Sequence, residues 1–262
     1  MKRLIYALFL LSQTAYAGQI TIFNVPGSSG TVITSQYLNP IYPSIALDTS
    51  TTSNLAAPGN PCNWTIQIGN GDASKNKVLV LACGETNNFI TSAQLGSQAF
   101  TRQQRTLWPG QFIGSDLWYL VNPSSGTQGI SLILDGGQCG GNTTTAKVFC
   151  TAIDFTGVSQ ATPIDISTGA FANTTSINAT ASLASSTDML FDSIVQNGFT
   201  KSMNPANNQI ILSSTTNLIQ GYATEQSYLG PETSGGSTQL GWTIGGIGGN
   251  VVYTWAALKQ AP

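Results

Sequence analysis

Carboxylates are the side chains best suited to acid–base chemistry in this sequence, and they are sparse. The chain has eleven acids among 262 residues. Glycoside hydrolysis needs two carboxyl groups about 5 to 10 Å apart. The close pair Asp188 and Asp192 would share one strand face at about 13 Å. The E-x-D-x-x-E pattern of sandwich-fold glucanases is also missing. We therefore keep glycoside hydrolase activity only as the last of three hypotheses.

The sequence contains no histidine. Histidine is the commonest general base and the commonest metal ligand. Ser-His-Asp and Cys-His hydrolases are therefore excluded, as are the zinc sites that include histidine. We predict no catalytic residue and expect a protein that is not an enzyme.

Three aspartates are candidate ligands for a structural calcium ion. Asp116, Asp154 and Asp188 are each predicted near the start or end of a strand, where sandwich proteins often hold a cation with carboxylates and carbonyl oxygens. The alternative is that each one caps a turn or accepts a backbone N–H. The absence of a D-x-D-x-D-G loop favours this alternative. No other cofactor is predicted.

Trp108 is the candidate for ligand binding. It lies in the segment 105–110, which reads as a loop, close to Arg102 and Arg105. An exposed tryptophan beside two arginines could stack on a sugar ring or anchor a protein partner. The alternative is that it closes the end of a sheet. Trp118 and Trp255 lie on apolar strands and are predicted to be core residues.

The four cysteines are Cys62, Cys83, Cys139 and Cys150. An even number in an exported chain predicts disulfides, and four cysteines allow three pairings. We favour Cys62–Cys83 and Cys139–Cys150, because each pair brackets a turn-rich segment. A site of four thiolates on a metal is disfavoured, because neither spacing is C-x-x-C.

The first seventeen residues have the pattern of a secretory signal peptide. Lys2 and Arg3 precede a short apolar run over 4–11, and Ala15-Tyr16-Ala17 predicts cleavage before Gly18. The apolar run is too short to span a bilayer. We expect a secreted or cell-surface protein with no transmembrane span after removal of the signal.

Charge excludes one class of partner. Without residues 1–17 the chain has seven basic and eleven acidic residues, a net charge of −4. Nucleic-acid binding needs clustered Lys and Arg, so it is not expected. Only 8% of the chain is charged. Hydroxyl and amide side chains must therefore cover the surface, as in many secreted β-proteins.

Short apolar or alternating segments separated by turn signals indicate an all-β protein with little helix. The strands expected in the body of the chain are 64–68, 77–83, 115–121, 129–134, 147–155, 176–183, 189–195, 209–213, 218–228, 238–244 and 251–258. The apolar run 77–83 is typical of a strand buried on both faces. Strands are also expected at 20–23 and 31–34. No internal repeat is visible in the sequence.

Residues 77–259 resemble a module of exported bacterial and some viral structural proteins. The matching segments, in order, are 76–80, 90–101, 116–123, 154–163, 188–190 and 255–259. The resemblance implies an antiparallel β-sandwich of the jelly-roll or concanavalin-like kind, found in surface and adhesin-like proteins and without established enzymatic activity. This chain adds an N-terminal extension and the four cysteines.

The expected organisation is a signal peptide at 1–17, a β-rich N-terminal extension at 18–60 and a β-sandwich domain at 61–262. The first functional hypothesis is a secreted, non-enzymatic surface, adhesive or extracellular structural module. The second is a lectin-like carbohydrate-binding module that uses Trp108. The expected partners are a glycan, a surface protein or further copies of the chain.

Overall fold

The computed structural model describes residues 45–52, 61–69, 76–110, 113–136, 148–183, 187–197, 202–206, 208–218, 222–231, 236–245 and 249–262. These residues form seventeen strands, and all of the paired strands run antiparallel. Within these ranges there is no helix, and so none that is long and apolar enough to cross a membrane. The prediction of an all-β protein is confirmed.

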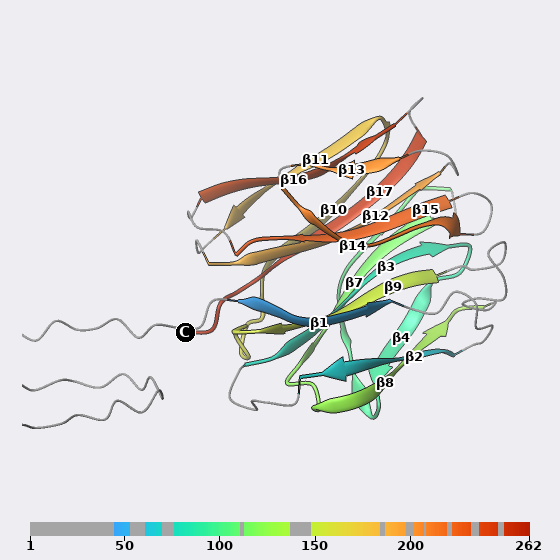
Figure 1. Cartoon of the computed structure of the whole chain (residues 1–262). Helices are drawn as coiled ribbons and strands as arrows, with labels where there is room; N and C mark the ends of the chain where they lie inside the picture. Colours follow the sequence, from blue (N-terminus) through green and yellow to red (C-terminus); the bar gives the residue numbers. More distant parts are fainter. Residues whose placement is uncertain are drawn as a thin grey trace, which may run out of the picture. The chain divides into compact units, whose positions relative to one another are not determined.

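The strands form four sheets, which we name by their position (Figure 1). The first inner sheet has the order β1 (Ala46–Thr52), β9 (Val148–Thr156), β3 (Val78–Thr86), β7 (Ile113–Val121), β6 (Thr101–Leu107). The first outer sheet has the order β2 (Cys62–Ile68), β8 (Gly126–Leu134), β4 (Ile90–Leu95), β5 (Gln98–Ala99). The second inner sheet has the order β10 (Ile164–Thr174), β17 (Gly249–Leu258), β12 (Met189–Asn197), β15 (Tyr222–Leu229), β14 (Ile210–Leu218). The second outer sheet has the order β11 (Ser176–Leu183), β16 (Gly236–Ile244), β13 (Met203–Pro205).

Three large apolar cores hold the four sheets in a stack, and a small fourth one of Ile113, Val195 and Val252 adds to the contact between the inner sheets. The first core joins the first outer and first inner sheets, with Leu79 and Trp118 among its buried residues. The second core joins the second inner and second outer sheets around Trp242 and Trp255. A middle core lies between the two inner sheets, where Phe155 packs against Phe191. Trp118 and Trp255 are thus core residues, as predicted.

β3 shows why one strand needs a continuous apolar run. Its alternate residues enter two different cores: Leu79 and Leu81 face the first core, whereas Val78 and Val80 face the middle core. Every residue of the strand is buried. The prediction of a strand buried on both faces is confirmed, because the strand lies inside a stack and has a sheet packed on each side.

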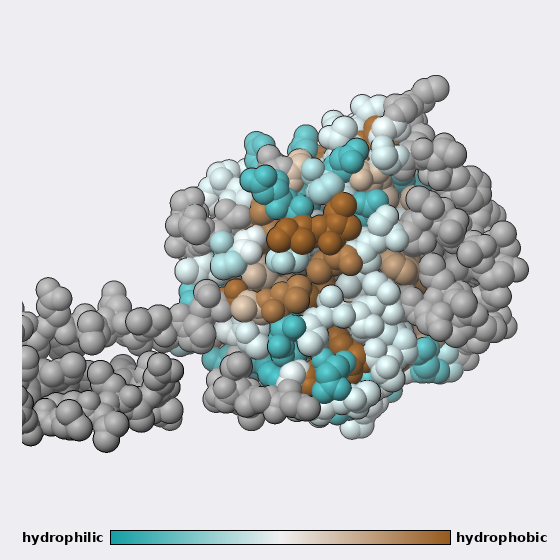
Figure 2. All heavy atoms as spheres, viewed as in Figure 1, coloured by the Kyte–Doolittle hydropathy of each residue, from teal (hydrophilic) through white to brown (hydrophobic). Residues whose placement is uncertain are grey.

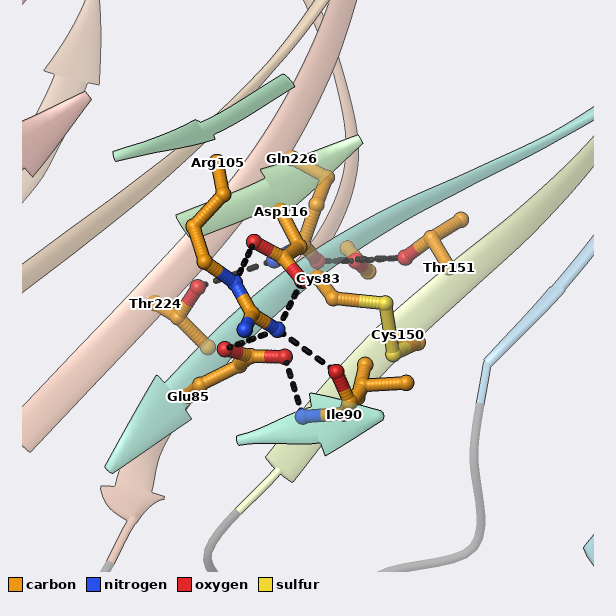
Figure 3. The surroundings of a disulfide bond; sticks show 10 residues. Cys83, Glu85, Ile90, Arg105, Asp116, Cys150, Thr151, Thr224 and Gln226 are labelled. Carbon is orange, nitrogen blue, oxygen red and sulfur yellow. Dashed lines mark hydrogen bonds and ion pairs between the residues drawn. A yellow bond between two sulfur atoms is a disulfide. The ribbon is translucent and has the colours of Figure 1, made fainter. Parts of the chain in front are cut away.

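The inner sheets are also joined by polar side chains. Thr224 Oγ1 donates to the Ile194 carbonyl at 2.7 Å, and Gln226 Nε2 donates to Thr224 Oγ1 at 2.9 Å. From the first inner sheet, Thr151 Oγ1 donates to Gln226 Oε1 at 3.1 Å (Figure 3). Buried hydroxyls and amides are costly unless they are paired. Their pairing across the sheets therefore fixes how the two halves of the chain pack.

The second half of the chain repeats the strand order of the first. The inner sheets β1-β9-β3-β7-β6 and β10-β17-β12-β15-β14 match strand for strand, and so do β2-β8-β4 and β11-β16-β13. The sequence predicted no repeat. What repeats is the order and pairing of strands, which different apolar residues can produce.

Register irregularities repeat at the same places. Pairing shifts by one residue at Leu47/Thr49 against β9 and at Ile164/Ile166 against β17. It shifts again at Arg102/Gln104 against β7 and at Ile211/Ser213 against β15. The two halves can be aligned at either pair of shifts, and the strand pairing then relates β3 to β12. Both alignments give the same match, in which residue 81 corresponds to residue 192. The two halves therefore correspond residue by residue in their inner sheets.

Several strands were not predicted. β1 falls in the predicted N-terminal extension but pairs with β9 as the edge of the first inner sheet. β10 and the strands β4 to β6 were also missed, because they are rich in Thr, Ser and Gln. The predicted signal peptide and the strands at 20–23 and 31–34 lie outside the described residues.

Candidate functional site

Arg105 is the centre of a cluster of charged groups at one end of the first inner sheet, which we call the Arg105 cluster (Figure 3). Its members are Glu85 on β3, Arg105 on β6 and Asp116 on β7. The guanidinium binds both oxygens of Asp116, with Nε donating to Oδ1 at 2.7 Å. Nη2 also donates to the Ile90 carbonyl at 2.7 Å and lies 3.5 Å from Glu85 Oε2. The guanidinium of Arg105 thereby ties β6 to three other strands, β3, β4 and β7.

Both carboxylates of the Arg105 cluster are completely buried. Burial raises the pKa of Glu85 well above its ordinary value, and the neighbouring Asp116 raises it further. Glu85 Oε1 accepts the backbone N–H of Ile90 at 3.0 Å. Each group finds its partners inside the cluster, so the arrangement positions strands and gives a substrate no path to either carboxylate.

The predicted ligand-binding residues lie apart from one another. Arg102 and Arg105 are on β6, a strand and not the predicted loop. Arg102 stacks over the ring of Trp118, with its guanidinium carbon 5.0 Å from the ring centre. Trp108 follows β6 and packs edge-on against Phe171 of β10, with ring centres 5.5 Å apart. Trp108 therefore lies where the two inner sheets meet, half-buried, and contacts the second half of the chain.

The favoured cysteine pairing is wrong. Cys83 is bonded to Cys150, which excludes both Cys62–Cys83 and Cys139–Cys150 (Figure 3). Cys83 and Cys150 are directly opposite each other on β3 and β9, with Cα atoms 4.1 Å apart. The disulfide pairing follows from which strands are neighbours in the sheet, and not from the turn-rich segments between the cysteines. Cys62 is also disulfide-bonded, and Cys139 lies outside the described residues. Disulfides are typical of an oxidising compartment.

Asp192 forms a second polar cluster, which the sequence analysis did not find. Its Oδ2 accepts hydrogen bonds from Gln209 at 2.8 Å, Trp242 at 3.0 Å and Tyr253 at 2.8 Å. Its Oδ1 accepts both the backbone N–H and the hydroxyl of Ser227. Burial raises the pKa of Asp192 to about 6, against the lowering effect of these donors. The signal in the sequence that could have revealed this cluster was an aspartate inside an apolar strand, together with Trp and Tyr on other strands.

The two halves stabilise the same place in different ways. Asp192 corresponds to Leu81, and the Ile194–Tyr253 pair corresponds to the Cys83–Cys150 disulfide. The first half thus has a covalent bond and apolar packing where the second half has a carboxylate that collects hydrogen bonds. In each half these interactions join the central strand of the inner sheet to the last strand of that half: β3 to β9, and β12 to β17.

The structure does not bring the three predicted calcium ligands together. Asp116 binds Arg105, Asp154 lies on β9 and accepts the Gly69 N–H at 3.4 Å, and Asp188 accepts the Gln260 N–H at 3.4 Å. Across the described ranges, no group of three or more acidic or cysteine side chains is arranged to hold a metal ion. Asp154 and Asp188 thus accept backbone N–H groups, the alternative that the sequence left open, whereas Asp116 binds an arginine side chain.

A shallow hollow lies on the outside of the first outer sheet. Its volume is 390 Å³, and it is lined by Asn63, Trp64, Thr65, Gly96, Gly129, Ile130 and Ser131. The hollow exists because Gly129 has no side chain: a Cβ there would meet nothing within 4 Å. It is open to solvent and combines an apolar floor with hydroxyl and amide groups.

The described polar clusters and the hollow are thus of two kinds. The Arg105 and Asp192 clusters are closed inside the protein, whereas the hollow and the edge strands face solvent. Comparisons with protein-family models, curated proteins and solved structures give no match. Only the solvent-facing features are placed to meet a partner.

Proposed function

We propose that this chain is a secreted, non-enzymatic structural module that associates with further copies of itself through the edges of its inner sheets. The observation that carries the proposal is the exposure of large apolar side chains on edge strands. Ile210 and Ile211 on β14 are 52% and 44% exposed, and Phe171 on β10 is 49% exposed. Edge strands with exposed apolar residues are templates for pairing with another chain.

One face of the molecule carries a group of apolar side chains (Figure 2). In Figure 2, apolar side chains gather over the region where β14 and β1 lie in Figure 1. Leu47, Leu212 and Tyr228 are partly buried beside the middle core and contribute to this region. With few charged residues on the chain, little electrostatic repulsion opposes association.

The repeated strand order supports a jelly-roll type for each half. In both halves the chain passes back and forth between an inner and an outer sheet, as in two-sheet jelly rolls. We therefore propose a tandem of two jelly rolls whose inner sheets pack face to face. Export is supported by the signal-like first seventeen residues and by the disulfide.

Self-association is tested with one matched pair of variants. Ile211→Lys places a charge on the exposed edge of β14, and Ile133→Lys places the same charge on β8, where Ile133 is 47% exposed on the first outer sheet. We expect sedimentation velocity to show assembly of the unmodified protein, its loss in Ile211→Lys and its retention in Ile133→Lys. Equal behaviour of both variants would show that the edge of β14 is not the interface.

Carbohydrate binding is the second candidate, and the hollow around Gly129 favours it. Asn63, Thr65 and Ser131 offer hydrogen-bonding groups to a sugar around Gly129. Gly129→Phe would place a ring in the hollow, where a Cβ on residue 129 meets nothing within 4 Å. A glycan array should then lose its signal with Gly129→Phe if the hollow binds sugar, or with Trp108→Ala if the surface beside Phe171 does. No signal from the unmodified protein removes this candidate.

A further inference from the structure

Three ionisable side chains meet around the backbone of Gly69 at one end of the first core. The Lys77 ammonium donates a hydrogen bond to the Gly69 carbonyl, and the Gly69 N–H donates to Asp154 Oδ2 at 3.4 Å. Asp48 Oδ2 lies 1.8 Å from the point where a Cβ on Gly69 would be, and Lys77 Nζ lies 3.2 Å from the same point. Only glycine leaves room for this arrangement. The missing side chain at residue 69 lets an amine and two carboxyl groups lie around the same piece of backbone.

The strand order places Asp154 in the middle of the three. Asp48 is on β1, Asp154 is on β9 and Lys77 immediately precedes β3, and these strands are neighbours in the order β1-β9-β3. Asp154 is opposite Leu79, and Lys77 lies two residues before Leu79 on the same face. Diagonal neighbours of this kind are within reach of a long side chain.

Burial surrounds Lys77 and Asp154 and favours the uncharged form of the aspartate. Lys77 is 5% exposed and Asp154 is completely buried, with its Oδ1 lacking a hydrogen-bond partner. The ammonium donates to the Gly69 carbonyl. Burial raises the pKa of Asp154 to about 6, against the lowering effects of the Gly69 N–H and of Lys77, and Asp48 adds to the rise. An amine and a carboxylic acid held together away from water are a pair that can condense, because little water is present to reverse the reaction.

We propose that Lys77 and Asp154 form an intramolecular amide bond, with Asp48 transferring the proton. The Lys77 ammonium first releases one proton, and the lone pair of the resulting neutral Nζ attacks Cγ of the protonated Asp154 and forms the C–N bond. The bond from Cγ to the hydroxyl oxygen then breaks. One proton from Nζ passes through the Asp48 carboxylate to that oxygen, which leaves as water. The products are an amide and one water molecule, and the step needs no oxidant or reductant.

The cross-link complements the disulfide. Lys77–Asp154 joins β3 to β9 near one end of their pairing, and Cys83–Cys150 joins the same two strands near the other. The central pair of the first inner sheet would then be covalently closed at both ends. Covalent bonds at both ends would make a module that bears load outside the cell harder to unfold. This benefit does not depend on whether the module associates with copies of itself.

Mass spectrometry of the full chain, after reduction and tryptic digestion, tests the proposal. Trypsin cannot cleave after an amide-linked lysine, so we expect residues 76–102 to remain joined to residues 148–201, with the mass of one water missing. In Lys77→Arg the cross-linked peptide should disappear, and in the control Lys259→Arg it should persist. Asp48→Asn should form the link more slowly than the unmodified protein. Separate, full-mass peptides containing Lys77 and Asp154 from the folded, unmodified protein would overturn the proposal.

Discussion

The Cys83–Cys150 disulfide gives the sharpest stability prediction. The bond closes a loop with a sequence separation of 67 residues in the first half of the chain. The chain-entropy relation assigns a loop of that size about 4 kcal/mol of stabilisation, through restriction of the unfolded chain. Replacing both cysteines by alanine should therefore lower the free energy of unfolding by about 4 kcal/mol. For a chain of this size, that corresponds to a fall in melting temperature of about 8 to 16 °C.

The assay is equilibrium unfolding in guanidinium chloride, followed by tryptophan fluorescence. Removing both cysteines together avoids a free thiol that could exchange with the bond at Cys62. In excess reductant, the unmodified protein and the double variant should unfold at nearly the same denaturant concentration, because only the disulfide distinguishes them. A loss under about 1 kcal/mol in the absence of reductant would refute the reasoning, because the entropy estimate would then fail by a factor of four.

The remaining predictions concern the second half and the contact between halves. Asp192→Leu leaves the buried donors of Trp242, Tyr253 and Gln209 without an acceptor, so urea denaturation should show a loss of about 3 kcal/mol or more. The pKa of Asp192 rises from 3.8 to about 6 on folding. The folded chain then binds this proton more tightly than the unfolded chain, and stability should fall as pH rises through that interval. Asp192→Leu should reduce this slope in denaturation series from pH 4 to pH 7. Gly169→Val should lower the melting temperature, because its Cβ would lie 1.7 Å from Thr106 Oγ1, whereas Gly129→Val, with open space around it, should not.

The sequence was most informative where burial alone decides the structure. The strand 176–183 was predicted to the residue, and the run 77–83 located β3 but missed its last three residues, because apolar patterning follows from which faces are covered. β6 and β10 escaped prediction because their Thr, Arg, Gln and Ser side chains show no clear alternation. β6 is held by a hairpin with β7, and β10 by pairing with β17, which is distant in the sequence.

The candidate site depended on long-range pairing even more. The opposition of Cys83 and Cys150 follows from the β3–β9 register, which separates the two residues by 67 positions and leaves no local trace. Arg105 was singled out as a ligand-binding residue because it lies near Trp108 in sequence. In the fold it turns toward Asp116 and Glu85, away from any ligand. The internal repeat was hidden because pairing, and not residue identity, is what the two halves share.

Electron microscopy of the protein recovered from the extracellular medium tests the central claim most directly. If the chain is an exported module that associates through the edges of its inner sheets, the micrographs should show regular assemblies of the unmodified protein, with single particles for Ile211→Lys. Single, uniform particles of the unmodified protein at every concentration would contradict the account.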